Sequence, residues 1–247
     1  KKYFIMKKII IIGAGAMGSA FAVPCLENKN DVTLIGTHLE DELINNIKSN
    51  DNFHPALSVK LPSKLKVEKF EKLKPILEDG TDIIVAGVSS IGIEWFVNQI
   101  KKVYKKNLPI ILLTKGLAIE DNELITLSDK IKSLLKEQGH TEVNVTAIKG
   151  PCLAAGLANK MRTGTVIANP DIKETEKLKK IISTNYYSTE ISDDLTGIEL
   201  SGAIKNIYSM LIGASEGLSN SKAPKEIQSK YYLNTSASLI HRSISEM

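Results

Sequence analysis

A glycine-rich turn near the amino terminus restricts the possible folds of this chain most strongly. Lys8–Gly13 (KIIIIG) is short and β-branched, which indicates a buried strand, and Ala16–Glu27 has the pattern of a helix. Between them, residues 13–18 (GAGAMG) match the pattern G-x-G-x-x-G. A strand, a glycine turn and a helix in this order predict the first unit of a sheet covered by helices.

The three glycines of the turn predict a dinucleotide-binding site. Gly13 permits the tight turn, Gly15 lets a pyrophosphate approach the backbone, and Gly18 lets helix and strand pack closely. The helix start offers free N–H groups and a partial positive charge to phosphates. The alternative is a close-packed turn that binds no ligand. We favour dinucleotide binding because the strand and the helix both flank the motif.

The residues after the second predicted strand bear on the choice of dinucleotide. NAD sites usually place Asp or Glu at the end of this strand, on the ribose hydroxyls. Here Val32–Ile35 is followed by Gly36, Thr37 and His38, and the first acid is Glu40. This pattern favours NADP slightly over NAD, since Thr37 and His38 are able to donate to a 2′-phosphate. The alternative for His38 is a solvent-facing loop residue.

The rest of the chain continues the alternation of short apolar runs and amphipathic stretches. We predict further strands at Asp82–Gly87, Pro109–Leu113, Val143–Ile148, Thr165–Ala168 and Tyr187–Ile191. We predict helices at Leu39–Ser49, Ile93–Lys105, Leu124–Gln138 and Lys173–Ser183. This order predicts an α/β fold with a Rossmann-type, doubly wound, mostly parallel sheet.

The pattern becomes entirely helical after residue 192. Leu195–Leu218 reads as one long helix, Ser219–Pro224 interrupts it, and a last helix runs from about Ile227 to Met247. No stop signal follows the last helix. We therefore expect a dinucleotide-binding domain over residues 1–192, followed at 193–247 by the start of a truncated helical substrate domain.

Composition excludes several other functions. The net charge is only +4, the lysines are scattered and aromatic residues make up 5%, which argues against nucleic-acid binding. Cys25 and Cys152 are far apart and lack paired histidines, so we expect no metal site and a reducing compartment. The first 25 residues superficially resemble a signal peptide, but three glycines and Pro24 interrupt that pattern. We expect a cytoplasmic protein without stable membrane insertion.

Ile198–Tyr208 (IELSGAIKNIY) places a single lysine, Lys205, among small and aliphatic residues. An apolar stripe runs along one side of this predicted helix: Leu200, Ile204, Ile207 and Leu211. Small and polar residues lie on the other side: Ser201, Gly202, Lys205, Asn206 and Ser209. The small residues let another surface or a ligand come close to the lysine. The alternative is an exposed lysine on a solvated helix.

Five segments together resemble the NAD(P)-dependent glycerol-3-phosphate dehydrogenases of bacteria and archaea. They are GAGAMGSA (13–20), LLTKGL (112–117), KGPCLAAGLA (149–158), GIELSGAIKNIYSMLIGASEGL (197–218) and NTSASLIHRSISEM (234–247). The resemblance implies reversible reduction of dihydroxyacetone phosphate to sn-glycerol 3-phosphate, a phospholipid precursor. It also implies a small phosphorylated substrate and, we expect, a homodimer.

The resemblance also implies roles for individual residues. The catalytic lysine falls on Lys205, with Asn206 beside it, and Lys115 would contact both substrate and nicotinamide. Two residues, Gly150 and Cys152, would line the substrate pocket. Residues implied to contact the dinucleotide are Ala16, Met17, Thr37, Lys115 and Ala154, in addition to the three glycines of the turn.

The chain departs from the family at several positions. Members often carry Ser or Thr at the position of Cys152, an aromatic residue at that of Met17, and His or Arg at that of Thr37. Members also continue into a Gly-x-Gly-Asp segment and an Arg-Asn pair that hold substrate, and these 247 residues contain neither.

Two other functions remain open. A 2-dehydropantoate reductase shares the GAGAMG opening and a lysine on a helical second domain. A non-catalytic dinucleotide sensor is the second alternative. The TKGL and IKN segments in this order favour the glycerol phosphate enzyme.

Overall fold

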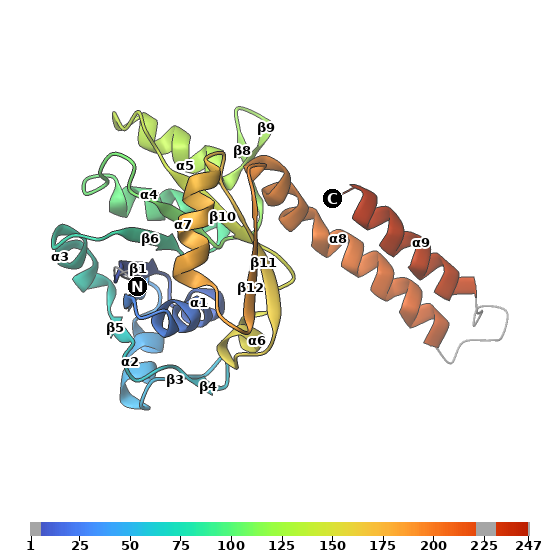
Figure 1. The fold of residues 1–247 in the computed structure, drawn as a ribbon, viewed down its shortest axis with the longest axis horizontal. Helices are drawn as coiled ribbons and strands as arrows, with labels where there is room; N and C mark the ends of the chain where they lie inside the picture. Colours follow the sequence, from blue (N-terminus) through green and yellow to red (C-terminus); the bar gives the residue numbers. More distant parts are fainter. Residues whose placement is uncertain (1–5, 221–230, 247) are drawn as a thin grey trace, which may run out of the picture.

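The structure is a computed structural model that describes residues 6–220 and 231–246. Its main sheet consists of β1 (Lys8–Ile12), β2 (Asp31–Ile35), β5 (Lys66–Glu68), β6 (Ile83–Ala86), β7 (Ile110–Leu112), β10 (Val145–Lys149), β11 (Thr163–Ala168) and β12 (Tyr187–Ser192). The strands lie in the order β12-β11-β10-β7-β6-β1-β2-β5 (Figure 1). All predicted strands are present. The short, charged β5 is an additional strand that its sequence pattern did not reveal.

The predicted fold class, a mostly parallel doubly wound sheet, is confirmed. Every pair of neighbouring strands is parallel except β10 and β11, which are antiparallel. The connection between these two strands holds only the five-residue helix α6 (Ala154–Ala158). Such a short connection returns the chain beside β10 rather than crossing over the sheet.

Helices cover both faces of the sheet. One face is covered by α1 (Ala16–Glu27), α2 (Asp41–Ser49), α6 and α7 (Ile172–Ile182). The other face is covered by α3 (Leu73–Glu78), α4 (Ile93–Ile100) and α5 (Leu127–Lys136). Strand β1 serves both cores, because Ile9 and Ile11 face one layer while Ile10 and Ile12 face the other. Each fully buried isoleucine stabilises the fold by about 1.5–3 kcal/mol.

Three of the predicted helices that cover the sheet differ from the observed ones by two or more residues at an end. The predicted helix Leu124–Gln138 was wrong at its start, because residues 124–126 belong to a strand hairpin of β8 (Leu117–Glu120) and β9 (Glu123–Thr126). The Thr126 hydroxyl accepts from the Asp129 N–H and so starts α5 three residues late. Helix α4 ends at Ile100, and α2 begins at Asp41 after a turn.

Short elements fill some of the remaining connections. A second hairpin consists of β3 (Phe53–His54) and β4 (Val59–Lys60), and two 3-10 turns are η1 (Phe70–Lys72) and η2 (Ser90–Gly92). None of these elements was predicted from the sequence, since two- and three-residue runs carry no measurable periodicity.

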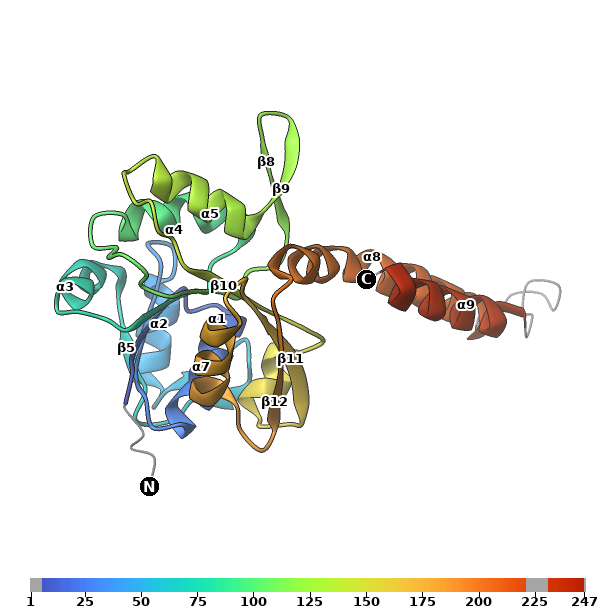
Figure 2. The ribbon, with the colours of Figure 1, turned by 45° about the horizontal axis from the view of Figure 1, so that its top comes forward.

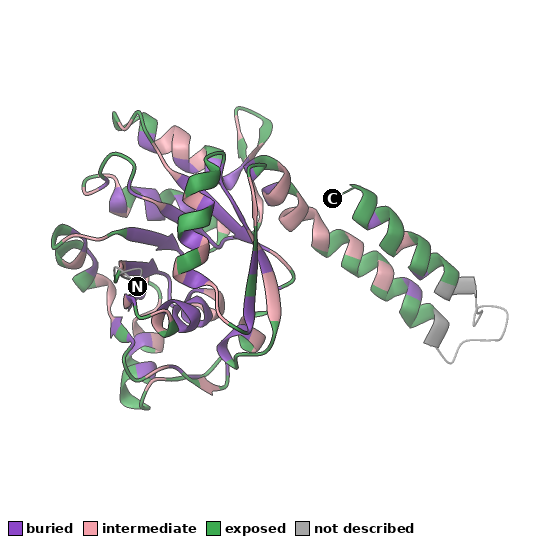
Figure 3. Cartoon of the chain, viewed as in Figure 1, coloured by how far each residue is buried: buried purple, intermediate pink, exposed green. Residues whose placement is uncertain are grey.

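Two long helices, α8 (Leu195–Asn220) and α9 (Tyr231–Glu246), pack side by side and extend away from the sheet (Figures 1 and 2). The start of α8 joins the sheet, where Leu195 and Ile198 pack on Ala147 and Ala168. Most of the described surface of the two helices is exposed (Figure 3). The first two residues of the predicted interruption, Ser219–Pro224, belong to α8, and the rest lie outside the described residues. The predicted helix start at Ile227 also lies outside them.

The predicted domain boundary at residue 192 coincides with the end of β12. The assignment of the helices that follow to a separate substrate domain stays a prediction. In the part of the chain that the structure describes, no helix combines the length and apolarity that a membrane crossing requires.

Candidate active site

The glycine turn has the geometry that its sequence predicts. Gly13 adopts a positive φ of 109°, and a side chain there would come within 2.6 Å of the Gly87 carbonyl oxygen. A side chain on Gly18 would overlap the carbonyl oxygen of Gly13. The nearest atom to a side chain on Gly15 would be 3.8 Å away, on Glu40. Packing therefore requires glycine at positions 13 and 18, whereas Gly15 borders open space.

The start of α1 fits an anionic group such as a pyrophosphate. Gly15 is the N-cap residue and supplies no side-chain cap, and the first turn contains no acidic residue. The first backbone N–H groups of the helix are therefore left for a ligand. Ala16 and Met17 begin the helix, are half-buried and pack on the core beneath it, which fixes the position of these N–H groups.

Glu40 brings a carboxylate to the edge of this turn, which corrects an inference from the sequence. Its Oε2 accepts from the Thr37 N–H at 2.7 Å and from the Ala14 N–H at 3.0 Å. The sequence suggested that no acid lies near the end of the second strand. The turn at residues 37–40 returns the carboxylate to that place, because the Glu40 N–H donates to the Thr37 carbonyl. Thr37 itself is half-buried.

His54 is a residue near the turn to which the sequence analysis assigned no role. Its side chain is fully buried, and its Nε2 lies 3.0 Å from the Ala14 carbonyl oxygen. Its Nδ1 accepts from the Leu57 N–H at 3.3 Å, so the proton resides on Nε2, which donates to Ala14. Glu40 thus accepts a hydrogen bond from the backbone N–H of Ala14, and His54 donates one to the backbone carbonyl of the same residue.

Lys115 lies at the same edge of the sheet as the glycine turn, and the charge of Lys205 acts on it. Lys115 follows β7, and Lys205 lies on α8 about two turns beyond Ile198, where that helix contacts the sheet. Partial burial, and next the positive charge of Lys205, lower the pKa of Lys115. The carboxyl ends of parallel strands share one edge, so β1 and β7 present the turn and Lys115 on the same side.

Lys149 is a third lysine near this edge of the sheet, and its sequence pattern predicted no role for it. It ends β10 and is only 4% exposed, and its Nζ donates to the Thr114 carbonyl. Burial lowers its pKa to about 8, an effect that the negative charge of Glu199 partly offsets. Glu199 is itself buried and accepts from the Ser128 N–H at 3.2 Å. The sequence signal that could have identified Lys149 is the position of a lysine at the end of a buried strand.

The small residues of the lysine helix do admit another surface, as the sequence suggested. A side chain on Gly202 would meet the aliphatic part of Lys149 at 3.4 Å. The side of α8 that carries Gly202 therefore packs on β10, and Lys205 is half-buried on the next turn. The predicted apolar stripe is largely exposed, with Ile207 at 55%. Asn206 is also exposed, and its approach to a substrate stays a prediction.

The segment after β10 places the other predicted pocket residues. A side chain on Gly150 would come within 2.9 Å of the Thr165 backbone, so glycine lets β11 approach. Cys152 is 5% exposed, and burial raises the pKa of its thiol. Ala154 begins α6, which packs against α1. The charge of Lys115 also acts on Cys152, which indicates that the two are near each other.

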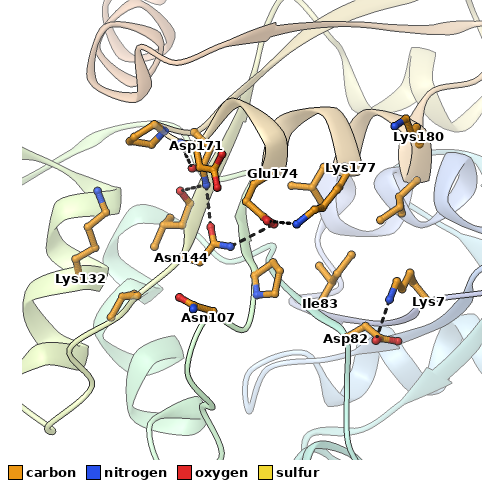
Figure 4. Close-up of a pocket in the computed structure, with 17 residues that line it drawn as sticks. Lys7, Asp82, Ile83, Asn107, Lys132, Asn144, Asp171, Glu174, Lys177 and Lys180 are labelled. Atoms are coloured by element: carbon orange, nitrogen blue, oxygen red, sulfur yellow. Dashed lines mark hydrogen bonds and ion pairs between the residues drawn. The ribbon is translucent and has the colours of Figure 1, made fainter. Parts of the chain in front are cut away.

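A cleft of about 1190 Å³ lies elsewhere, at the amino ends of the strands beneath α7 (Figure 4). Residues that line it include Lys7, Ile83, Asn107, Asn144 and Lys177. No predicted site residue lines this cleft. Ligands of doubly wound sheets bind outside the carboxyl ends of the strands, so we do not assign the dinucleotide to it. Among the described residues, no group of three or more His, Cys, Asp or Glu side chains could hold a metal.

The family match and the two relatives described next all carry the name glycerol-3-phosphate dehydrogenase. A family described as "NAD-dependent glycerol-3-phosphate dehydrogenase N-terminus" matches residues 8–175. The NADP(+)-dependent glycerol-3-phosphate dehydrogenase of Archaeoglobus fulgidus is 34% identical over 231 residues, which cover 93% of this chain and 66% of the relative. Glycerol-3-phosphate dehydrogenase [NAD(P)+] of Bacillus pumilus is 28% identical, over 98% of this chain and 65% of the relative.

Solved structures agree in fold. Glycerol-3-phosphate dehydrogenase from Coxiella burnetii superposes with a TM-score of 0.77 at 23% identity and covers 98% of this chain and 67% of its own. The enzyme from Saccharomyces cerevisiae gives a TM-score of 0.74 at 21% identity, over 98% of this chain and 69% of its own. The chain spans about two thirds of the length of the relatives it matches. Since the family match covers more than half of its residues, this chain belongs to the NAD-dependent glycerol-3-phosphate dehydrogenase family.

Proposed function

We propose that this chain transfers a hydride between a bound nicotinamide dinucleotide and dihydroxyacetone phosphate, forming sn-glycerol 3-phosphate, and catalyses the reverse reaction. The observation that carries this proposal is the position of Lys115, just after β7 at the edge of the sheet that presents the glycine turn, where the positive charge of Lys205 also acts on it. The positive charges of Lys115 and Lys205, beside the glycine turn, would attract the phosphate of a phosphorylated ketone. The product would supply the backbone of phospholipids.

Lys205 is the proposed proton donor. A dinucleotide held by the glycine turn would supply a hydride to the carbonyl carbon, and negative charge would develop on the carbonyl oxygen. The Lys205 ammonium stabilises that charge and gives its proton to the oxygen, and its neutral amine takes a proton back in the reverse direction. Asn206 donates from its amide to the same oxygen, and Lys115 binds the substrate beside the nicotinamide.

The remaining site residues have binding roles in this proposal. Gly150 and Cys152 line the substrate pocket, where a buried protonated thiol replaces a hydroxyl. Ala154 contacts the dinucleotide, together with Ala16 and Met17. The half-buried positions of these three residues, at the starts of α6 and α1, support their assignment.

We further propose a slight preference for NADP over NAD. The name of the Archaeoglobus fulgidus relative states NADP dependence, and Thr37 and His38, which follow β2, have side chains able to donate to a 2′-phosphate. The carboxylate of Glu40 opposes this preference, because it adds a negative charge at the same place. Because these two contributions oppose each other, we expect the affinities for NAD and NADP to differ by less than about tenfold.

A homodimer and a cytoplasmic location complete the proposal. The family resemblance supports the dimer, which light scattering of the purified protein would test. Cys25 and Cys152 are both free, buried thiols, which suits a reducing compartment.

Oxidation of NADH and NADPH by the complete protein tests the proposed function. We expect turnover with dihydroxyacetone phosphate and none with 2-dehydropantoate. Turnover with 2-dehydropantoate alone would identify the related reductase instead. Tight dinucleotide binding without turnover on either ketone would identify a sensor. Either of these two results would overturn the proposal.

A further inference from the structure

Lys149 is a buried charged residue to which the proposed mechanism assigns no step. It ends β10, and only 4% of its surface is exposed. Burial of an ammonium is unfavourable, and a well-packed hydrophobic side chain in such a place is often as stable or more stable. A lysine at this position therefore points to a role that its ammonium performs.

The ammonium of Lys149 holds the loop that carries Lys115. This loop connects the end of β7 to the start of β8. Lys149 Nζ donates to the Thr114 carbonyl, and the Thr114 hydroxyl donates to the Val88 carbonyl at 2.7 Å. Thr114 is thus bonded through both its carbonyl and its side chain. Because Lys115 is the next residue, these bonds determine where its backbone lies.

The aliphatic part of the same side chain supports the helix that carries Lys205. A side chain on Gly202 would meet Cγ and Cδ of Lys149 at 3.4 Å, so the backbone of α8 lies against this part of the lysine. One turn earlier, Glu199 accepts from the Ser128 N–H at 3.2 Å. Positions 199, 202 and 205 are spaced by three and lie along one side of the helix. The contacts at 199 and 202 therefore set the side of α8 from which Lys205 projects.

The charge of Lys149 acts on groups of both elements. Burial lowers the pKa of Lys149 to about 8, the negative charge of Glu199 raises it, and the positive charge of Lys115 lowers it. Glu199 is 1% exposed, and burial raises the pKa of its carboxyl. Lys149 thus interacts electrostatically with a residue of the loop and with a residue of the helix.

We propose that Lys149 is a positioning residue, whose hydrogen bond to Thr114 and contact with Gly202 fix Lys115 relative to Lys205. This inference rests on the proposed function and adds a residue that acts through Lys115 rather than on the substrate. The two lysines serve one substrate molecule, and a displacement of about 1 Å in a reacting site lowers the rate by up to about a hundredfold. Lysine combines an ammonium with a four-carbon aliphatic chain, so one residue makes both contacts.

Lys149→Met in the complete protein tests this role, because it keeps an apolar chain and removes the ammonium. We expect kcat/KM for dihydroxyacetone phosphate to fall by about ten- to a hundredfold. The affinities for NADH and NADPH should change less than about twofold, since Lys149 is not part of the glycine turn.

Lys130→Met is the matched control. The Lys130 side chain is only 14% exposed, and its ammonium pairs with Glu94 at 3.3 Å and with Glu120 at 3.0 Å. The substitution therefore removes another poorly exposed ammonium and its partners, but none that holds Thr114. We expect it to change kcat/KM by less than about twofold.

A double-mutant cycle separates positioning from a general loss of structure. If Lys149 acts through Lys115, Lys149→Met should lower kcat/KM by less than about twofold in a protein that already carries Lys115→Met. An equal reduction in both backgrounds would overturn the proposal, because a general loss of structure does not depend on Lys115. Circular dichroism and urea denaturation show which variants are folded under the assay conditions.

Gly202→Val disturbs the same contact from the helix and removes no charge, so it serves if Lys149→Met does not fold. Its side chain enters the space of the Lys149 aliphatic part, and we expect kcat/KM to fall about tenfold with unchanged dinucleotide affinity. This reduction should also shrink below about twofold in the Lys115→Met background.

The outcomes separate this inference from the proposed function. If the wild-type protein turns over dihydroxyacetone phosphate and folded Lys149→Met is no slower than Lys130→Met, the positioning role is wrong and the proposed function stands. If the wild-type protein does not turn over dihydroxyacetone phosphate, the proposed function is wrong, and the positioning role is wrong with it.

Discussion

The buried ammonium of Lys149 donates a hydrogen bond to the carbonyl of Thr114, the residue directly before Lys115. The Thr114 hydroxyl donates in turn to the Val88 carbonyl at 2.7 Å. Val88 directly follows Gly87, which contacts the glycine turn. The aliphatic part of Lys149 packs on Gly202 of the lysine helix. One buried side chain thus connects the loop of Lys115 with the helix that carries Lys205.

The burial of Lys149 predicts a specific dependence of stability on pH. Its pKa falls from 10.5 to about 8 in the folded protein, so the folded state releases this proton at lower pH than the unfolded state. Between these two values the unfolded chain binds more protons, and the free energy of unfolding rises with pH. Relative to Lys149→Met, the wild-type protein should gain on the order of 2–3 kcal/mol from pH 8 to pH 10.5.

Urea denaturation at several pH values measures this difference. Lys180→Met is a suitable control, because Lys180 is exposed on α7 and should show no such trend. A constant difference between wild type and Lys149→Met across this pH range would show that Lys149 keeps its ordinary pKa.

Replacement of Lys205 should separate chemistry from cofactor binding. Lys205→Ala removes the proposed proton donor, so we expect kcat in the complete protein to fall by about 10²- to 10⁴-fold. The affinity for NADH and NADPH should change less than about twofold, because Lys205 is not part of the glycine turn. Stopped-flow turnover and equilibrium binding measure the two effects. Lys180→Ala is the control, and near wild-type turnover of Lys205→Ala would rule out this role.

The carboxylate of Glu40 should influence the choice between dinucleotides. Glu40→Gln keeps an oxygen that accepts from the Ala14 and Thr37 N–H groups but removes the negative charge. We expect NADP affinity to rise about two- to fivefold relative to NAD affinity, since repulsion of a 2′-phosphate is removed. Titration calorimetry with both cofactors measures the ratio. The exposed Glu42 on α2 provides the control substitution Glu42→Gln, and an unchanged ratio in Glu40→Gln would place the 2′-phosphate elsewhere.

Replacement by alanine should affect stability at one glycine of the turn and dinucleotide binding at another. Gly18→Ala places a methyl group against the Gly13 carbonyl oxygen, so we expect a loss of about 2–4 kcal/mol in unfolding free energy. Gly15→Ala meets no atom closer than 3.8 Å and should change stability by less than about 1 kcal/mol. It should instead weaken dinucleotide binding about tenfold, because the methyl group enters the phosphate cradle. Thermal melts and binding titrations on both variants distinguish these effects, and equal losses of stability would contradict the open position of Gly15.

Local patterns made much of the fold predictable. The β-branched runs identified the long strands, and G-x-G-x-x-G between a strand and a helix identified the sharp turn with its required Gly13 and Gly18. Strand β5 and the β8–β9 hairpin escaped prediction. They are too short for a period, and Thr126 was not recognised as a helix cap.

The site was predictable only where a motif carried it. The positions of Lys115 and Lys205 followed from segments of family sequence, and in the fold the charge of Lys205 acts on Lys115 and lowers its pKa. Glu40 and His54 were not assigned to the turn, because their bonds to Ala14 span 26 and 40 residues. Lys149 was overlooked for the same reason, since its partner Thr114 lies 35 residues away.

The sequence by itself determined the order of strands and helices and the backbone of the dinucleotide turn, because these depend on side-chain size and period within a few residues. Only the tertiary structure decided which charges are buried and which polar groups meet at the edge of the sheet. Solvation and hydrogen bonding of a side chain depend on what the fold places around it, and for Lys149, Glu199 and Glu40 those neighbours include groups contributed by distant elements.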